Sequence, residues 1–192
     1  PFINVIERKP EDKNLSFGSS WLHQDTSYLA NDRPRYTMLM GIEIPNGQGN
    51  TIFSSGFNAY KKLPDEIKHK IKNATGIFSS AGPIAVTRLE REKEMGIKSS
   101  DSMEAEHPIV KMVNGKKTLY VSPGHLMEIK NVDKKDAVYL KKYLIDHVNK
   151  KEFIFSYEWS KGDICLWDNL SILHMASEIK NCRRVMHRIT MK

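Results

Sequence analysis

The sequence predicts a mainly β fold with a few covering helices, arranged as a jelly roll or another barrel-like sandwich. Short apolar segments bounded by turn residues recur along the chain, and only two stretches show helical periodicity. The 192 residues are enough for one sizeable core and too few for two independent ones. We therefore expect a single domain over residues 1–192.

The strand signals are β-prone apolar runs that stop at turn residues. Residues 36–44 give the clearest signal, because Pro45 and the pair Asn46-Gly47 follow directly. Further segments of this kind are residues 51–53, 118–121, 153–159, 163–167 and 184–191.

Two amphipathic helices interrupt the strands. The first begins at Pro64, where a missing N–H costs nothing and the acidic residues that follow meet the positive end of the helix dipole; Ile67 and Ile71 then repeat at i, i+4. The second covers residues 134–149 with Asp133 as N-cap. Its apolar stripe consists of Ala137, Leu140, Leu144 and Val148.

The charged segment of residues 88–106 breaks the strand pattern. Such a segment is usually a solvated helix or loop, and the alternative is a lid over a site.

Composition narrows the class of protein. Hydrophobic residues make up 40% and charged residues 28%, which fits a globular protein and excludes disorder as the main state. No apolar run approaches the roughly 18 residues that span a bilayer, and residues 1–14 lack the apolar stretch of a signal peptide. We expect a cytoplasmic protein without a membrane partner.

Charge and cysteine content indicate the kind of ligand. The 30 Lys and Arg exceed the 23 Asp and Glu, but the lysines are scattered rather than clustered, which favours small acidic ligands over nucleic acid. Cys165 and Cys182 have no CxxC spacing, so neither a disulfide framework nor a zinc knuckle is indicated. Oligomeric state is not readable, and a homo-oligomer stays open.

The first candidate site is the motif His23-Gln24-Asp25. In an extended segment, side chains two residues apart project from the same face, so His23 and Asp25 lie together. A neutral imidazole and a carboxylate suit a first-row divalent metal. Alone the motif is weak, because such a pair is more often a polar couple at the surface.

A second candidate is His174, which follows the apolar segment from residue 163. In a closed sheet it can fold back beside His23 and Asp25 and complete a 2-His-1-carboxylate facial triad. The alternative is an isolated histidine that packs or hydrogen-bonds at a strand end.

A third candidate is the pair Arg184 and Arg188. In an extended segment both point to the same face, and burying two permanent charges is costly without acidic partners. If that face meets solvent, the pair has no special meaning.

Several blocks of sequence together resemble the taurine dioxygenase-like family of Fe(II)/2-oxoglutarate-dependent dioxygenases over residues 20–192. Each block is modestly specific, but their joint order and spacing match the family. The blocks are His23 with Asp25, residues 45–53, 57–64, 119–124 and 162–169, His174, and residues 183–188.

The resemblance implies a double-stranded β-helix with iron held by His23, Asp25 and His174. It also implies that Arg184 and Thr51 bind the distal carboxylate of 2-oxoglutarate, a task that suits the arginine fork. Arg188 matches the position that faces the acidic group of the substrate. Aromatic rings such as Phe53 and Trp167 are candidates for the pocket wall, although buried aromatics are more often plain core.

The implied reaction hydroxylates a small anionic substrate, with taurine or another alkylsulfonate as the leading candidate, and releases succinate and carbon dioxide. The presence of Asp25 favours hydroxylation over halogenation, because related halogenating enzymes lack this carboxylate. Arg188 supports an anionic substrate and does not distinguish a sulfonate from a carboxylate.

Three departures from the family pattern stand out. Residues 48–51 read Gln-Gly-Asn-Thr where the family usually has Gly-Gly-Asp-Thr, and Leu22 separates Trp21 from His23. Only 22 residues precede His23, so we expect part of the family's N-terminal segment, and of the substrate pocket, to be missing. Two rival functions stay open: the same chemistry on a cationic or nucleic-acid substrate, and a catalytically silent barrel that binds metal and 2-oxoglutarate.

Overall fold

Two antiparallel sheets form a sandwich in the computed structural model, which describes residues 2–12, 20–85 and 101–192. The first sheet has the order β1 (Asn4–Arg8), β12 (Arg184–Met191), β2 (Tyr36–Glu43), β10 (Ile164–Asp168). The second has the order β11 (Ile172–Ala176), β3 (Thr51–Ser55), β9 (Ile154–Tyr157). Leu39 and Met186 of the first sheet pack with Phe53 of the second in one apolar cluster, so the two sheets face each other. The predicted jelly roll is confirmed.

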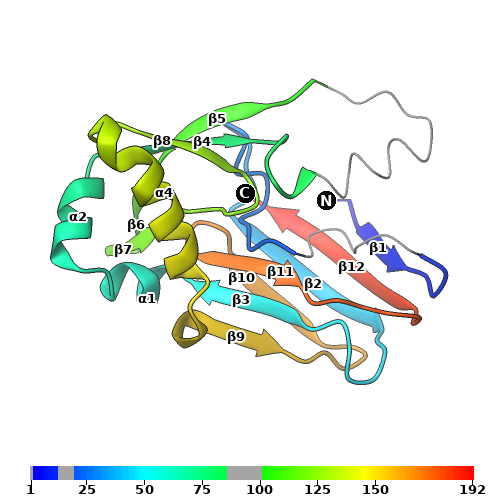
Figure 1. Cartoon of the computed structure of the whole chain (residues 1–192). Helices are drawn as coiled ribbons and strands as arrows, with labels where there is room; N and C mark the ends of the chain where they lie inside the picture. Colours follow the sequence, from blue (N-terminus) through cyan, green and yellow to red (C-terminus); the bar gives the residue numbers. More distant parts are fainter. Residues whose placement is uncertain (1, 13–19, 86–100) are drawn as a thin grey trace.

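A group of smaller strands and helices lies at one end of the sandwich (Figure 1). It contains the sheet of β5 (Glu104–Pro108), β4 (Thr75–Ser79) and β8 (Leu126–Lys130), and the hairpin of β6 (Val110–Val113) and β7 (Lys116–Leu119). The helices α1 (Gly56–Lys61), α2 (Asp65–Ile71) and α4 (Lys134–Val148) gather at the same end, and a 3-10 helix (Lys151–Phe153) leads into β9.

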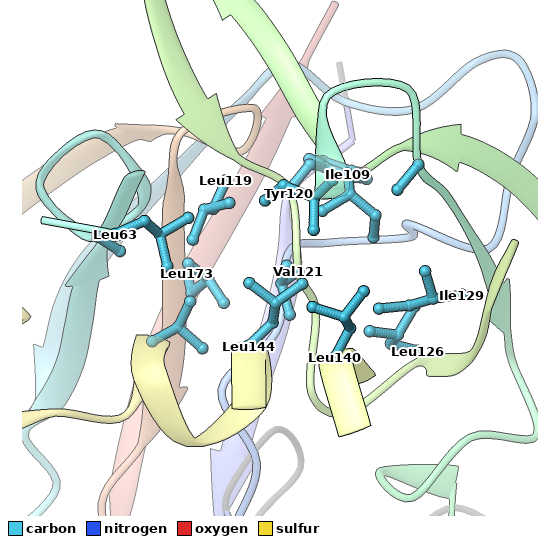
Figure 2. Packing of buried hydrophobic residues seen from close by; sticks show 14 of the residues in the cluster. Leu63, Ile109, Leu119, Tyr120, Val121, Leu126, Ile129, Leu140, Leu144 and Leu173 are labelled. Atoms are coloured by element: carbon cyan, nitrogen blue, oxygen red, sulfur yellow. The ribbon is translucent and has the colours of Figure 1, made fainter. Parts of the chain in front are cut away.

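The larger core lies between α4 and the sheets. Leu140 and Leu144 point from α4 toward Val121, Leu126 and Leu173 (Figure 2), and all five side chains are fully buried. The stripe predicted for this helix therefore forms the contact face, with Ala137 half-buried at its start. Asp133 caps the helix as predicted, accepting a hydrogen bond from the Lys135 amide at 3.4 Å.

Truncating this contact is expected to cost much of the stability of the fold. The change Leu144→Ala should lower the free energy of unfolding by about 3 kcal/mol, since it removes buried methyl groups and leaves a cavity. Urea denaturation followed by circular dichroism measures the loss. Val138→Ala on the same helix is the control, because Val138 is 81% exposed. Equal losses in the two variants would contradict this packing.

Each predicted strand and helix has a counterpart, but the sequence did not predict α1, β1, β4, β6, β8 and β11. The strand predicted at 153–159 is shorter, because Phe153 ends the 3-10 helix and β9 stops at Tyr157. The strand predicted at 118–121 begins at Lys116 and ends at Leu119. The prediction of a helix or loop over 88–106 is wrong at its end: Glu104 to Glu106 belong to β5, which alternates exposed and buried residues beside β4. The rest of that segment, up to residue 100, lies outside the described residues.

Candidate metal centre

The backbone brings His23 and His174 together. His174 lies in the middle of β11, and the segment containing His23 pairs with it through two hydrogen bonds: the His23 amide donates to the His174 carbonyl at 3.0 Å, and the reverse bond measures 2.9 Å. The two rings consequently lie with their centroids 4.4 Å apart. Asp25 follows two residues after His23, as the predicted alternation requires.

The three side chains form one buried group with the donor set of a metal site. Asp25 Oδ1 lies 4.0 Å from Nε2 of His23 and 3.7 Å from Nε2 of His174. One ligand atom from each residue lies within 4.8 Å of the others, and all three residues are buried. Two imidazoles and a carboxylate at this separation suit a first-row divalent metal.

Hydrogen bonds to neighbouring atoms leave the potential ligand atoms free. His23 Nδ1 lies 3.0 Å from the Trp21 carbonyl oxygen, to which it can only donate, so Nε2 keeps its lone pair. The Thr37 hydroxyl donates to Asp25 Oδ2 at 2.6 Å, which leaves Oδ1 on the side of the histidines. Partners of this kind orient metal ligands in proteins.

The protonation states also favour metal binding. Burial lowers the pKa of His23, and burial together with the nearby His23 charge lowers the pKa of His174 to about 3. Burial raises the pKa of Asp25, but His174, Arg188, His23 and the Thr37 hydrogen bond outweigh it and bring the value to about 2. At neutral pH the group therefore presents two neutral imidazoles and a carboxylate.

A hydrogen-bonded chain supports Asp25 from behind. Thr37 Oγ1 accepts a hydrogen bond from Asn169 Nδ2 at 2.8 Å, and Asn169 Oδ1 accepts one from the Trp167 indole at 3.1 Å. The Trp167 ring packs against His174 with centroids 4.6 Å apart. The chain thus connects the carboxylate with the second histidine.

Removing the Thr37 hydroxyl tests this support. Thr37→Val keeps the shape of the side chain but leaves Asp25 Oδ2 without that donor, so we expect a roughly tenfold weaker affinity for Mn(II) by calorimetry. Thr190→Val makes the same chemical change at an exposed position and should leave the affinity unchanged. An unaltered affinity in Thr37→Val would show that the hydroxyl does not position the carboxylate.

Two cavities flank the buried group. A cavity of about 50 Å³, here called the Arg184 cavity, is lined by residues that include Thr51, Trp167 and Arg184. A cavity of about 110 Å³, here called the Tyr28 cavity, is lined by residues that include Tyr28 and His125. His23 and Arg188 line both cavities, so the site has two compartments that meet at the candidate ligands.

Arg184 is a buried cation whose donors are not used by the described residues. Its Nε and Nη2 are buried without a hydrogen-bond partner there, and burial lowers its pKa to about 10, which still leaves it charged at neutral pH. Such a group calls for an anion. Thr51 lines the same cavity, and its oxygen accepts a hydrogen bond from the Trp159 indole at 2.9 Å, so its own proton is free to donate.

Gly49 makes room for this arginine. It has φ of +77°, and a Cβ added to it would lie 2.8 Å from Arg184 Cδ. Both the positive φ and the close approach of Arg184 therefore favour glycine at this position of the Gln-Gly-Asn-Thr turn. Asn50, where the family usually has aspartate, donates to the Ser156 hydroxyl at 3.0 Å.

Arg188 lies between the two compartments. Its Nη1 is 3.6 Å from Asp25 Oδ1, which supplies an acidic partner for this partly buried arginine. Arg184 and Arg188 both line the Arg184 cavity, as their shared face in the sequence predicts, although β12 has a register irregularity between Val185 and Met186.

The two aromatic candidates occupy different places. Trp167 lines the Arg184 cavity, whereas Phe53 packs edge-on against Trp167 and lines neither cavity beside the metal ligands. Sequence reasoning missed Thr37, Asn169, Tyr28 and His125. Tyr28 and Asn169 lie within or beside the recognised motifs, but Thr37 and His125 carry no local signal of a site.

The sandwich and its buried group define the class of jelly-roll proteins with a candidate 2-His-1-carboxylate metal site. The family described as "Taurine catabolism dioxygenase TauD, TfdA family" matches residues 3–190, and the chain belongs to this family. No helix in the described part of the chain is long and apolar enough to span a bilayer.

Individual relatives are distant. The chain is 29% identical over 184 residues to an alkylsulfatase of Acinetobacter baylyi, covering 90% of this chain and 56% of the relative. It is 26% identical over 184 residues to an alpha-ketoglutarate-dependent sulfate ester dioxygenase of Pseudomonas putida, covering 90% and 59%. The chain thus spans less than two thirds of the length of these relatives.

A solved structure shares the fold. The taurine dioxygenase of Burkholderia xenovorans superimposes with a TM-score of 0.75 at 24% identity, covering 97% of this chain and 63% of that one.

Proposed function

We propose that this chain carries the catalytic site of an Fe(II)/2-oxoglutarate-dependent dioxygenase that hydroxylates a small anionic substrate. The observation that carries the proposal is the buried group of His23, Asp25 and His174 with a cavity on each side, both lined by arginine. Iron and 2-oxoglutarate would supply the oxidising chemistry, with succinate and carbon dioxide as co-products. Membership in the family supports the same reaction class.

The two cavities would bind different ligands beside the metal. His23, Asp25 and His174 hold the metal, and Arg184 with Thr51 binds the distal carboxylate of 2-oxoglutarate in the Arg184 cavity. The primary substrate occupies the Tyr28 cavity, where Arg188 faces its anionic group. The buried walls exclude water from the reacting atoms.

The substrate class is a small organic anion. Arg188 is a permanent cation whose planar fork matches a carboxylate or a tetrahedral oxyanion. Taurine and other alkylsulfonates are candidates, and the names of the two relatives add sulfate esters. We also propose that residues 1–192 form a single domain and that the protein has the cytoplasmic location expected from the sequence.

Turnover with a panel of anions tests the proposal. With Fe(II), 2-oxoglutarate and air, we expect succinate formation that increases when an alkyl sulfate, an alkylsulfonate or a carboxylate of matched length is added. Arg188→Ala should raise the KM for that anion at least tenfold and weaken 2-oxoglutarate binding much less.

Other outcomes would redirect the assignment. Metal binding without any 2-oxoglutarate decarboxylation would favour the catalytically silent barrel. Stimulation only by a base-modified oligonucleotide would favour the same chemistry on nucleic acid.

A further inference from the structure

His125 is a buried histidine that the proposed reaction does not yet use. It lines the Tyr28 cavity, with its ring centroid 5.8 Å from that of His23 and 5.1 Å from that of Tyr28, both edge-to-face. The residue is 5% exposed. Its backbone amide donates to the Ser122 carbonyl at 2.9 Å, which fixes the turn that carries the ring.

Two serine hydroxyls lie beside one nitrogen of this ring. Nδ1 is 2.9 Å from Ser27 Oγ and 3.1 Å from Ser122 Oγ. Ser122 Oγ already accepts a hydrogen bond from the Gln24 amide at 3.1 Å, so its own proton is available for Nδ1. In the tautomer in which Nδ1 accepts from these hydroxyls, the ring proton lies on Nε2 and the ring is uncharged.

The second nitrogen has no hydrogen-bond partner among the described residues. Hydrogen bonds of His125 to the described residues involve Nδ1 and the backbone, and none involves Nε2. The ring lines the Tyr28 cavity, so an acceptor bound in that cavity is the partner available to an Nε2–H donor.

Arg188 determines what kind of acceptor fits. It lines the same cavity and attracts an anion, so a single oxyanion can accept from both side chains. A neutral N–H adds a directional bond without burying a second positive charge beside the arginine and the metal.

We propose that His125 is a specificity-determining residue that donates its Nε2–H to the oxyanion of the primary substrate, alongside Arg188. This inference rests on the proposed function, because that function places the substrate in the Tyr28 cavity.

Binding without turnover tests the inference. Calorimetry on the protein loaded with Mn(II) and 2-oxoglutarate, without oxygen, gives the Kd of hexyl sulfate, hexanesulfonate and hexanoate. We expect His125→Phe, which keeps an aromatic ring but has no N–H, to weaken the best-bound anion roughly tenfold. His125→Gln should recover part of the loss, because its amide carries a donor. The affinity for 2-oxoglutarate should stay within about twofold.

A matched control separates the loss of the N–H donor from a general effect of replacing histidine by phenylalanine. His69→Phe makes the same change at an exposed position on α2 and should leave every Kd unchanged. Nitrogen chemical shifts of the zinc-loaded protein report the tautomer directly, with a bare Nδ1 and a protonated Nε2 expected for His125. A proton on Nδ1 would overturn the inference.

The outcomes distinguish this inference from the function on which it rests. If Arg188→Ala loses the anions and His125→Phe does not, His125 is not a substrate donor and the proposed function stands. If the unaltered protein binds 2-oxoglutarate but no anion, the role of His125 is wrong while the keto-acid site stands. If it binds neither, both proposals are wrong.

Discussion

The variant His174→Ala is expected to lose metal binding and, with it, turnover of 2-oxoglutarate. Two protein ligands rarely hold a divalent metal against water, and His174 contributes one of the three donors that lie within 4.8 Å of one another. We expect an Mn(II) affinity at least a hundredfold weaker by calorimetry and no detectable succinate.

His187→Ala is the matched control for this prediction. His187 lies in β12 of the facing sheet and is not part of the buried group, so its loss should leave metal affinity unchanged. Thermal unfolding of both ligand-free variants checks that the fold persists. Full succinate formation by His174→Ala in metal-stripped buffer would contradict the assigned ligands.

The variant Arg184→Ala is expected to weaken 2-oxoglutarate binding roughly hundredfold. It removes the charge-assisted fork that a carboxylate needs in the Arg184 cavity. The dissociation constant of Arg184→Lys should lie between those of the unaltered protein and Arg184→Ala, since lysine restores the charge but not the planar fork. Calorimetry on the Mn(II)-loaded protein without oxygen gives the three dissociation constants.

Stability measurements separate this effect from unfolding. Arg184 is buried with two donors unpaired among the described residues, so removing it relieves a cost in the ligand-free protein. The melting temperature of ligand-free Arg184→Ala should therefore equal or exceed that of the unaltered protein. If Arg188→Ala lost 2-oxoglutarate and Arg184→Ala lost only the anionic substrate, the two roles would be reversed.

Elements whose pattern is local were predictable from the sequence. The α4 helix is an example, because its N-cap and its apolar stripe are formed by residues that lie close together in the sequence. By contrast, β1 has mostly exposed side chains and owes its existence to pairing with β12 at the other end of the chain. The same holds for β5. Its charged residues are typical of a loop, and the strand forms because it pairs with β4. Pairing between distant segments is not visible in a local pattern.

The site shows the same limit. Spacing placed His23 and Asp25 on one face, but His174 is joined to them by a backbone bridge between distant segments. The residue pattern left the role of His174 open between metal ligand and isolated histidine, and the family resemblance favoured the ligand. Thr37 and His125 had no signal at all. Their roles depend on a hydroxyl and a ring nitrogen whose neighbours come from other parts of the chain.

Anaerobic titration of Fe(II) and 2-oxoglutarate into the metal-free protein tests the central claim most directly. The weak visible charge-transfer band of the iron–keto acid chelate should appear at one equivalent of each, and it should shift when a bound anion such as taurine or hexyl sulfate is added. Arg184→Ala should require far more keto acid for the same band. Absence of the band in the unaltered protein, at concentrations where Fe(II) is bound, would contradict the assignment of this site to 2-oxoglutarate chemistry.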